Sequence, residues 1–203
     1  MNAMPPNPAL LWRRAKPLAG VPAQPGVVAG LDLSLTSTGF AAIRQGALHG
    51  FALAPRDLTG AARLAWFYDE IGALVRRYAV EMVALEGYSF GSRNGREVAG
   101  ELGGVARLAL HHAGVPFMVV PPTSLKMFAT GRSNAEKDSV AKELFKRWSV
   151  DLDGNDATDA AGLALMAFQR LHCGLRLTTV QQKAMESIVT KPKRSAATGC
   201  KKR

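Results

Sequence analysis

Val27-Val28-Ala29-Gly30-Leu31-Asp32-Leu33 is the stretch of sequence that decides the fold. Every residue in it except Asp32 is apolar or glycine, and such an unbroken run is typical of a strand that is covered on both faces. Asp32 interrupts this run. Because burial of an unpaired charge is costly, this carboxylate requires a cation or an opening to solvent. The segment therefore predicts a central strand that carries a functional acid.

Four other segments predict strands. Residues 39–44 and 48–53 follow the first strand after short turns, which indicates a three-strand antiparallel meander. The apolar runs 82–86 and 117–120 come after helix-length segments, as parallel strands do. The expected fold class is therefore α/β, with a mixed central sheet of an antiparallel meander plus parallel strands, flanked by helices.

Helical patterns fill the gaps between these strands. Residues 61–78 place apolar side chains at helical spacing with charges between them. Residues 96–112 do the same, but their Gly100, Gly103 and Gly104 are costly in a helix unless a helix, the sheet or DNA packs closely there. Three further helices are expected over residues 123–129, 133–148 and 156–171, and a Ser133-x-x-Glu136 capping box predicts the start of the second of these.

The two ends of the chain differ from its middle. Residues 1–25 hold six prolines and predict an extended arm, residues 26–174 predict one folded domain, and residues 175–203 predict a basic flexible tail. Of the formal net charge of +10, residues 180–203 contribute +6 and residues 1–25 contribute +3, which leaves about +1 for the rest. The ends therefore suit a polyanionic partner, whereas the acids of the domain need their own explanation.

Three more acids stand where an apolar core is expected. Glu86 ends the run 82–85, and Asp156 and Asp159 open an otherwise apolar helix. Because these two aspartates are three residues apart, they share one helix face, and a helix N-terminus favours negative charge. Each acid alone has an ordinary explanation as a turn former or an N-cap. Together with Asp32, they would form an all-oxygen site suited to Mg²⁺ or Mn²⁺.

The order of these acids resembles that of a known family. The segments GLDLSLTSTGF (30–40), ALE (84–86) and DATDA (156–160) are similar to the Asp…Glu…Asp-x-x-Asp pattern of RuvC-like Holliday junction resolvases. The resemblance covers roughly residues 27–171. It implies an RNase H-like fold and a catalytic, metal-binding set of Asp32, Glu86, Asp156 and Asp159 with two Mg²⁺ ions, for which Mn²⁺ can substitute. It also implies a homodimer that nicks opposed strands of branched DNA.

The resemblance extends to basic residues. The segment SNAEK (133–137) is similar to the family segment whose lysine faces the active site, which implies that Lys137 stabilises the charged phosphate as part of the catalytic set. Lys126 stands at the family's other basic position and is expected to bind the DNA backbone. The loop 91–96, beside Glu86, is polar and basic, so Arg93 and Arg96 suit phosphate contacts.

Two departures from the family pattern affect DNA recognition. Leu33-Ser34 follows Asp32 where cellular members carry Pro-Gly, so we expect Ser34 or Thr36 to contact phosphate. The family's junction-wedging aromatic is replaced by Ser89, and its neighbours Tyr88 and Phe90 are the candidates to unstack a base step. These changes are typical of a divergent, phage-type member. They leave open a nuclease with a broader range that includes flaps and Y-forks.

Two other function classes compete with a nuclease. Residues 32–39 also resemble the first phosphate loop of actin-like ATPases and sugar kinases, but the chain is too short for the two domains that those proteins need. A non-cleaving junction-binding protein could use the same fold, yet it has no physical need for four clustered carboxylates beside a polyanion. We therefore expect a crossover junction endodeoxyribonuclease of DNA recombination and repair.

The setting of this activity is also an expectation. No apolar run approaches the roughly 20 residues of a membrane span, and the start of the chain lacks the layout of a secretory signal. We expect no membrane partner. The expected location is the cytoplasm of a bacterium or of a virus-infected bacterial cell, in association with the nucleoid.

Overall fold

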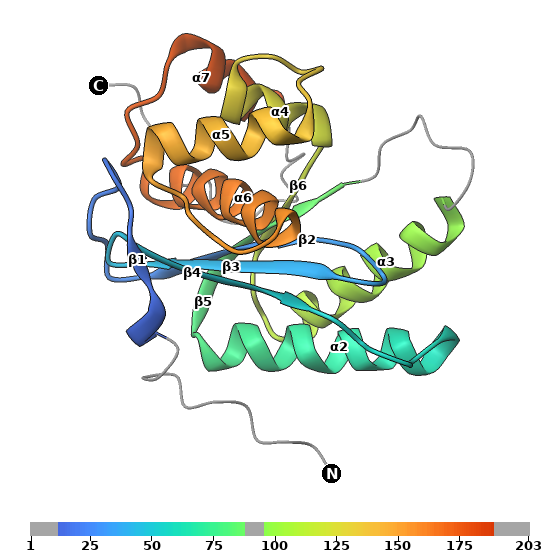
Figure 1. Cartoon of the computed structure of the whole chain (residues 1–203). Helices are drawn as coiled ribbons and strands as arrows, with labels where there is room; N and C mark the ends of the chain where they lie inside the picture. Colours follow the sequence, from blue (N-terminus) through green and yellow to red (C-terminus); the bar gives the residue numbers. More distant parts are fainter. Residues whose placement is uncertain (1–11, 88–95, 189–203) are drawn as a thin grey trace.

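The computed structural model describes residues 12–87 and 96–188 (Figure 1). Within these residues the strands form one sheet in the order β1-β4-β3-β2-β5-β6. Strands β2, β3 and β4 form an antiparallel meander, and β5 and β6 run parallel to β2. The mixed sheet expected from the sequence is confirmed. The strand bounds are Lys16–Pro17 for β1, Val27–Asp32 for β2, Thr38–Arg44 for β3, Ala47–Leu53 for β4, Val80–Glu86 for β5 and Phe117–Val120 for β6.

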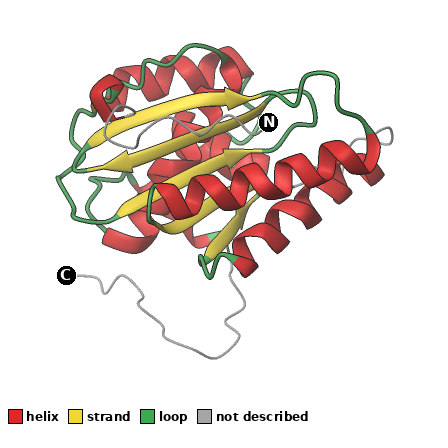
Figure 2. Cartoon of the chain, turned by 90° about the horizontal axis from the view of Figure 1, so that it is seen from below, coloured by secondary structure: helices red, strands yellow, loops and turns green. Residues whose placement is uncertain are grey.

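Helices cover both faces of the sheet. One face carries α2 (Gly60–Arg77) and α3 (Arg96–His112), which are the long helices nearest the viewer in Figure 2. The other face carries α6 (Asn155–His172), and a further layer of helices lies beyond it (Figure 1). This outer layer consists of α4 (Pro122–Thr130), α5 (Lys137–Trp148) and α7 (Thr179–Glu186). None of the helices in the described ranges combines the length and the apolar character of a membrane span.

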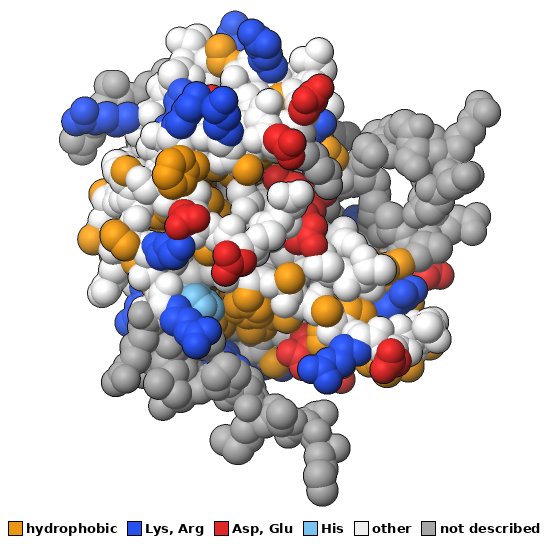
Figure 3. Space-filling model, viewed as in Figure 1, with side chains coloured by type: hydrophobic (Ala, Val, Ile, Leu, Met, Phe, Trp, Pro, Cys, Tyr) orange, Lys and Arg blue, Asp and Glu red, His pale blue; other side chains and the backbone are white. Residues whose placement is uncertain are grey.

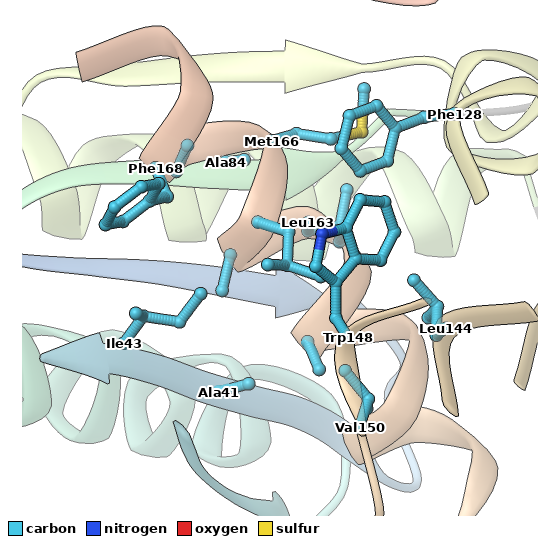
Figure 4. Close-up of a cluster of buried hydrophobic side chains, with 14 of the residues drawn as sticks. Ala41, Ile43, Ala84, Phe128, Leu144, Trp148, Val150, Leu163, Met166 and Phe168 are labelled. Atoms are coloured by element: carbon cyan, nitrogen blue, oxygen red, sulfur yellow. The ribbon is translucent and has the colours of Figure 1, made fainter. Parts of the chain in front are cut away.

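The sheet divides the apolar interior in two because successive strand residues point to opposite faces. Val28 and Ala84 pack in the core under α6, whereas Leu31 and Leu85 pack in the core against α2 and α3. Strand β2 is buried along its whole length, which explains its unbroken apolar run. The core under α6 extends into the outer layer, where Trp148 stacks on Phe128 with ring centroids 5.3 Å apart (Figure 4).

Both ends of the described chain take part in the fold. Strand β1 pairs with β4 at one edge of the sheet, and Leu18 and Val21 are buried in the core under α6. We expected residues 175–203 to form a flexible tail, but α7 lies within this range and packs on α4. The apolar contacts of α7 centre on Ala184, which is too sparse a pattern to indicate a buried helix from sequence.

The start of α5 differs from the expectation. Its N-cap is Glu136, without a side-chain cap hydrogen bond, and Ser133 lies in the preceding turn. The predicted Ser133-x-x-Glu136 capping box is therefore wrong. The preceding helix α4 ends at Gly131, which adopts a left-handed conformation, and the Thr130 hydroxyl accepts a hydrogen bond from the Arg132 N–H at 3.1 Å. A capping box does occur at Thr178, where α7 begins.

Candidate active site

Asp32 and Glu86 end two adjacent parallel strands. Leu31 of β2 pairs with Leu85 of β5, so the residues that follow them lie side by side at the same edge of the sheet. Neighbouring strands are about 5 Å apart at the backbone. Asp32 is buried, with 8% of its surface exposed, and Glu86 is half-buried. The two acids that the sequence predicts on different strands are therefore neighbours.

Both carboxylates belong to the sheet face that α6 covers. Val28 on β2 and Ala84 on β5 pack in the core under α6. Asp32 is four residues after Val28, and Glu86 is two residues after Ala84, so strand alternation directs all four side chains to the same face. The acids thus end two rows of side chains that otherwise fill this core.

Helix α6 brings the other two acids to the same edge. Gly39 on β3 is the cross-strand partner of Asp32, and a Cβ atom there would collide with the carbonyl group of Asp156. Further along the helix, a Cβ at Gly30 would collide with the backbone of Ala160. The two glycines therefore allow α6 to rest directly on β2 and β3, and its N-terminus lies over the end of β2.

The first turn of α6 provides a favourable setting for negative charge. Asp156 lies on this turn, Asp159 follows three residues later on the same face, and both are half-buried. The N-cap is Gly154, with φ of 90°, and its carbonyl accepts a hydrogen bond from the Thr158 hydroxyl at 2.9 Å. Because the first N–H groups of a helix have no intrahelical partner, this end of α6 carries a partial positive charge. It lowers the cost of gathering carboxylates there.

Hydroxyl groups hold the turn that follows Asp32. The fully buried Thr38 donates its hydroxyl hydrogen bond to the Ser34 carbonyl at 2.7 Å and accepts one from the Ser34 N–H at 3.1 Å. The Ser34 and Thr36 hydroxyls lie 3.2 Å apart. Thr38 therefore fixes the turn, and Ser34 and Thr36 form a pair of hydroxyls close in sequence to Asp32.

The acids come from two strand ends and a helix start at one edge of the sheet, but their side chains do not form a closed cage in the described residues. Across residues 12–87 and 96–188, no three acidic, histidine or cysteine side chains are grouped closely enough to hold an ion. The donor set itself is all carboxylate, which matches the hard-oxygen preference of Mg²⁺ and Mn²⁺. Figure 3 shows acidic side chains at this end of the sheet, and lysine and arginine side chains over the layer of α4, α5 and α7.

The structure describes only some of the basic and aromatic residues that are predicted to contact DNA. Lys126 is half-buried on α4, the helix that follows β6. Lys137 begins α5 and Arg96 begins α3, but their side chains are outside the described part of the structure. Tyr88, Phe90 and Arg93 also lie outside the described residues. Most of the predicted DNA contacts therefore stay predictions.

Two residues of this site were not singled out in the sequence. Gly39 allows α6 to reach the end of β2, and Thr38 holds the turn after Asp32. The available signal for Gly39 was a glycine at the start of an apolar strand, which often marks a close backbone approach. Thr38 carried no comparable signal, because a threonine in a strand is common.

A family model for crossover junction endodeoxyribonuclease RuvC matches residues 28–167, which include all four acids. The chain belongs to the RuvC family. This RuvC-family chain is 30% identical over 146 residues to a crossover junction endodeoxyribonuclease RuvC of Hyphomonas neptunium, a match that covers 66% of this chain and 87% of that relative. A relative of the same name from Sorangium cellulosum is 32% identical over 131 residues, covering 61% and 73%.

Solved structures agree on the fold. The RuvC structure of Thermus thermophilus superposes on this RuvC-family chain with a TM-score of 0.62 and 24% identity, covering 75% of this chain and 99% of that one. The yeast mitochondrial Holliday junction resolvase gives a TM-score of 0.50 at 14% identity, covering 82% of each. The RNase H-like fold expected from the sequence is confirmed. Strand β1 and helix α7 lie outside the residues that the family model matches.

Proposed function

We propose that this RuvC-family chain cuts Holliday junctions at a site built from Asp32, Glu86, Asp156 and Asp159. The observation that carries the proposal is the meeting of the ends of β2 and β5 with the start of α6 at one edge of the sheet. Family membership supports an endodeoxyribonuclease, and the matched residues include all four acids.

The proposed cofactor is a pair of Mg²⁺ ions, for which Mn²⁺ can substitute, held by the four carboxylates. When bound, such ions activate a water molecule and stabilise the leaving oxygen in phosphodiester hydrolysis. The acids have to turn toward one another from their positions in the structure. Asp32 is held by its buried strand, and the N-terminus of α6 offsets the repulsion between Asp156 and Asp159. We propose that Lys137 stabilises the negative charge on the phosphate.

The proposed DNA contacts surround these acids. Ser34 follows Asp32 by two residues, and residues 88–95 follow Glu86 closely in the chain. We assign Lys126, Arg93 and Arg96 to backbone phosphates, Ser34 to a phosphate hydrogen bond, and Tyr88 and Phe90 to the unstacking of a base step. Such phosphate contacts set the position of the duplex without reading its sequence.

The proposed assembly is a homodimer through the exposed face of α3. Leu108 is 48% exposed, and Gly104, one turn earlier on the same face, is exposed with open space where a Cβ would stand. Gly103, by contrast, is buried. Gly104 and Leu108 thus form a smooth apolar strip on which a second copy can pack closely. Two copies would carry two sites, as paired nicks in a junction require.

A second candidate function is a broader nuclease that also cuts flaps and Y-forks. It is favoured by the sequence departure at Ser89, where the family's wedging aromatic is missing. Either activity would serve DNA recombination and repair, and we propose the cytoplasm and the nucleoid as its location.

Cleavage of labelled four-way junction, Y-fork, flap and linear duplex DNA tests both candidates. Wild-type protein and Asp32→Asn are compared with Mg²⁺, with Mn²⁺ and with EDTA. Paired, metal-dependent nicks in the junction alone support the resolvase, and similar cutting of forks and flaps supports the broader nuclease. The absence of cleavage on every substrate, with junction binding retained, would make the chain a binding protein instead.

A further inference from the structure

Helix α5 carries an exposed aromatic side chain beside a pocket. Phe145 has 56% of its surface exposed, whereas its neighbour Leu144 is buried in the core under α6. The Phe145 ring borders a shallow pocket of about 280 Å³, which lies between α5 and the segment that leads into α6. A large apolar ring that faces solvent at the mouth of a pocket suits a contact with another molecule.

The pocket has a fixed apolar floor. Val150 lines it and is itself buried, with 3% of its surface exposed. Leu152 also lines it and packs so closely on β4 that a Cβ atom at Gly50 would collide with its side chain. Helix α5 packs on α6 (Figure 1). Because the core holds these neighbours in place, little ordering is needed when a ligand fills the pocket.

The charges around the pocket suit a polyanion. Lys142 is exposed and lines the pocket. The Nζ atom of Lys146 lies 2.9 Å from a Glu143 carboxylate oxygen, and the Nζ atom of Lys16 lies 2.6 Å from the carboxylate of Asp151, which lines the pocket. Each of these two acids is thus offset by a lysine, and Lys142 adds a further positive charge for a phosphate group beside the pocket.

The pocket lies beside the start of α6, where two of the proposed catalytic acids stand. Thr158 lines the pocket and lies in the chain between Asp156 and Asp159. Because successive helix residues are turned by about 100°, Thr158 points to a different side of α6 than the two acids. The pocket and the acids are therefore about one helix diameter apart, roughly 10 Å. Phosphates of one strand follow each other at about 3.4 Å along the duplex axis, so this distance corresponds to about three nucleotides.

A DNA base is the occupant that combines a flat apolar surface with an attached phosphate. Bases stack on aromatic side chains through their π-faces, whatever the sequence. In an intact duplex the bases are stacked inside, whereas a base that has already lost its pairing partner is released at the lowest cost. Such bases occur where strands separate at a branch point. A pocket of this kind therefore binds branched DNA in preference to linear duplex.

We propose that the pocket beside Phe145 receives an unstacked base near the branch point of the DNA. The Phe145 ring is the stacking surface, and Lys142 binds the adjoining phosphate. Phe145 thereby contributes to the selectivity for branched DNA. The proposal rests on the nuclease function proposed above, because the acids on α6 define which strand passes the pocket.

Binding by Phe145→Leu and Phe145→Tyr tests the stacking surface. Both changes are made in the Asp32→Asn background, and the affinities for a four-way junction and for linear duplex are measured from about 50 to 200 mM salt. Leucine keeps an apolar side chain but removes the ring, so Phe145→Leu should weaken junction binding about tenfold, with the same dependence on salt and the same affinity for linear duplex. Phe145→Tyr, which keeps the ring, should bind like the parent protein.

Two further variants provide the comparison. Lys142→Gln should lower the slope of log affinity against log salt by about 1, as the loss of one phosphate contact does. Val180→Ala on α7, which changes another exposed apolar side chain, should bind like the parent protein. Unchanged junction affinity in Phe145→Leu, the result expected if the pocket binds a protein instead, overturns the proposal. An equal loss on linear duplex overturns it as well.

Junctions with a single abasic nucleotide locate the base. One base at a time is removed within about four nucleotides of the branch point, which covers the distance from the acids to the pocket. At the contacted position the loss caused by Phe145→Leu should disappear, and at the other positions it should persist. A loss of the same size on every abasic junction would contradict stacking on one base. Cleavage of the intact junction by wild type is measured separately, so a failure of the nuclease function appears as uncut DNA and leaves the binding comparison valid.

Discussion

Gly39 packs directly against the main chain of Asp156, so the strand opposite Asp32 touches the first turn of α6. This contact joins two parts of the active site that are far apart in the sequence. It depends on the lack of a side chain at Gly39, and any side chain there has to displace either α6 or β3.

Gly39→Ala is expected to lower both the stability of the domain and its cleavage activity. The added methyl group has no room beside the Asp156 carbonyl, and overpacking of this kind costs about 1–3 kcal/mol of unfolding free energy. Because α6 carries two of the acids, we also expect at least a tenfold loss of junction cleavage. The matched control is Gly72→Ala on α2, where the new methyl meets only the flexible end of Arg76. The melting temperature of Gly72→Ala should be equal to or higher than that of wild type. Equal losses of stability and cleavage in the two variants would contradict the explanation.

Leu108→Asp is expected to disrupt the proposed dimer. The substitution puts a charge on the exposed apolar strip of α3 without removing a buried contact of the monomer. Light scattering should show a monomer, and paired nicks in one junction should become single nicks. Leu58→Asp, which changes an exposed leucine in the segment before α2, is the control and should leave the dimer intact. A dimer that survives Leu108→Asp rules out this face.

Acid is expected to destabilise the domain through His49. Burial, and then the charge of Arg14, lower the pKa of His49 below its usual 6.5, and the side chain lies within a cluster with Trp12, Phe51 and Tyr78. The unfolded chain therefore binds the proton more readily, so stability is lost as the pH falls below 6.5. The melting temperature of His49→Phe should fall less between pH 7.5 and 5.5 than that of wild type. Parallel curves for the two proteins would exclude His49 as a cause.

Gln181→Ala is expected to release α7. The change leaves the Phe128 carbonyl without its buried donor, which costs about 1–3 kcal/mol. The exposed neighbour Gln182 provides the control, and Gln182→Ala should keep the wild-type melting temperature. The anchoring role of Gln181 is contradicted if the two variants melt alike.

The sequence was sufficient for five strands of the sheet and for the acids that end two of them, but it did not predict the edge strand β1. The buried run around Asp32 and the run that ends at Glu86 each contain a charge that an apolar core cannot tolerate alone, so their position was informative. The i, i+3 spacing of Asp156 and Asp159 likewise placed them on one face at the start of a helix, where the structure has them.

Other features depend on tertiary contacts that leave little trace in the sequence. The Ser133 capping box prediction was wrong because Ser133 lies in the turn between α4 and α5, and Glu136 is the N-cap of α5. Helix α7 was missed because its stability comes from one buried glutamine and one buried alanine. The roles of Lys137, Arg93 and the aromatic pair beside Ser89 stay predictions, since their side chains lie beyond the described parts of the structure.

Single-turnover cleavage of a four-way junction by Asp32→Asn, Glu86→Gln and Asp153→Asn tests the central claim most directly. Asp153 is an exposed acid just ahead of α6 and has no place in the proposed site. Asp32→Asn and Glu86→Gln should abolish cleavage while binding stays equal or tightens, because each removes a negative charge that repels phosphate. Asp153→Asn should cleave like wild type. Undiminished cleavage by Asp32→Asn and Glu86→Gln, or an equal loss in all three variants, would contradict an active site at the meeting of β2, β5 and α6.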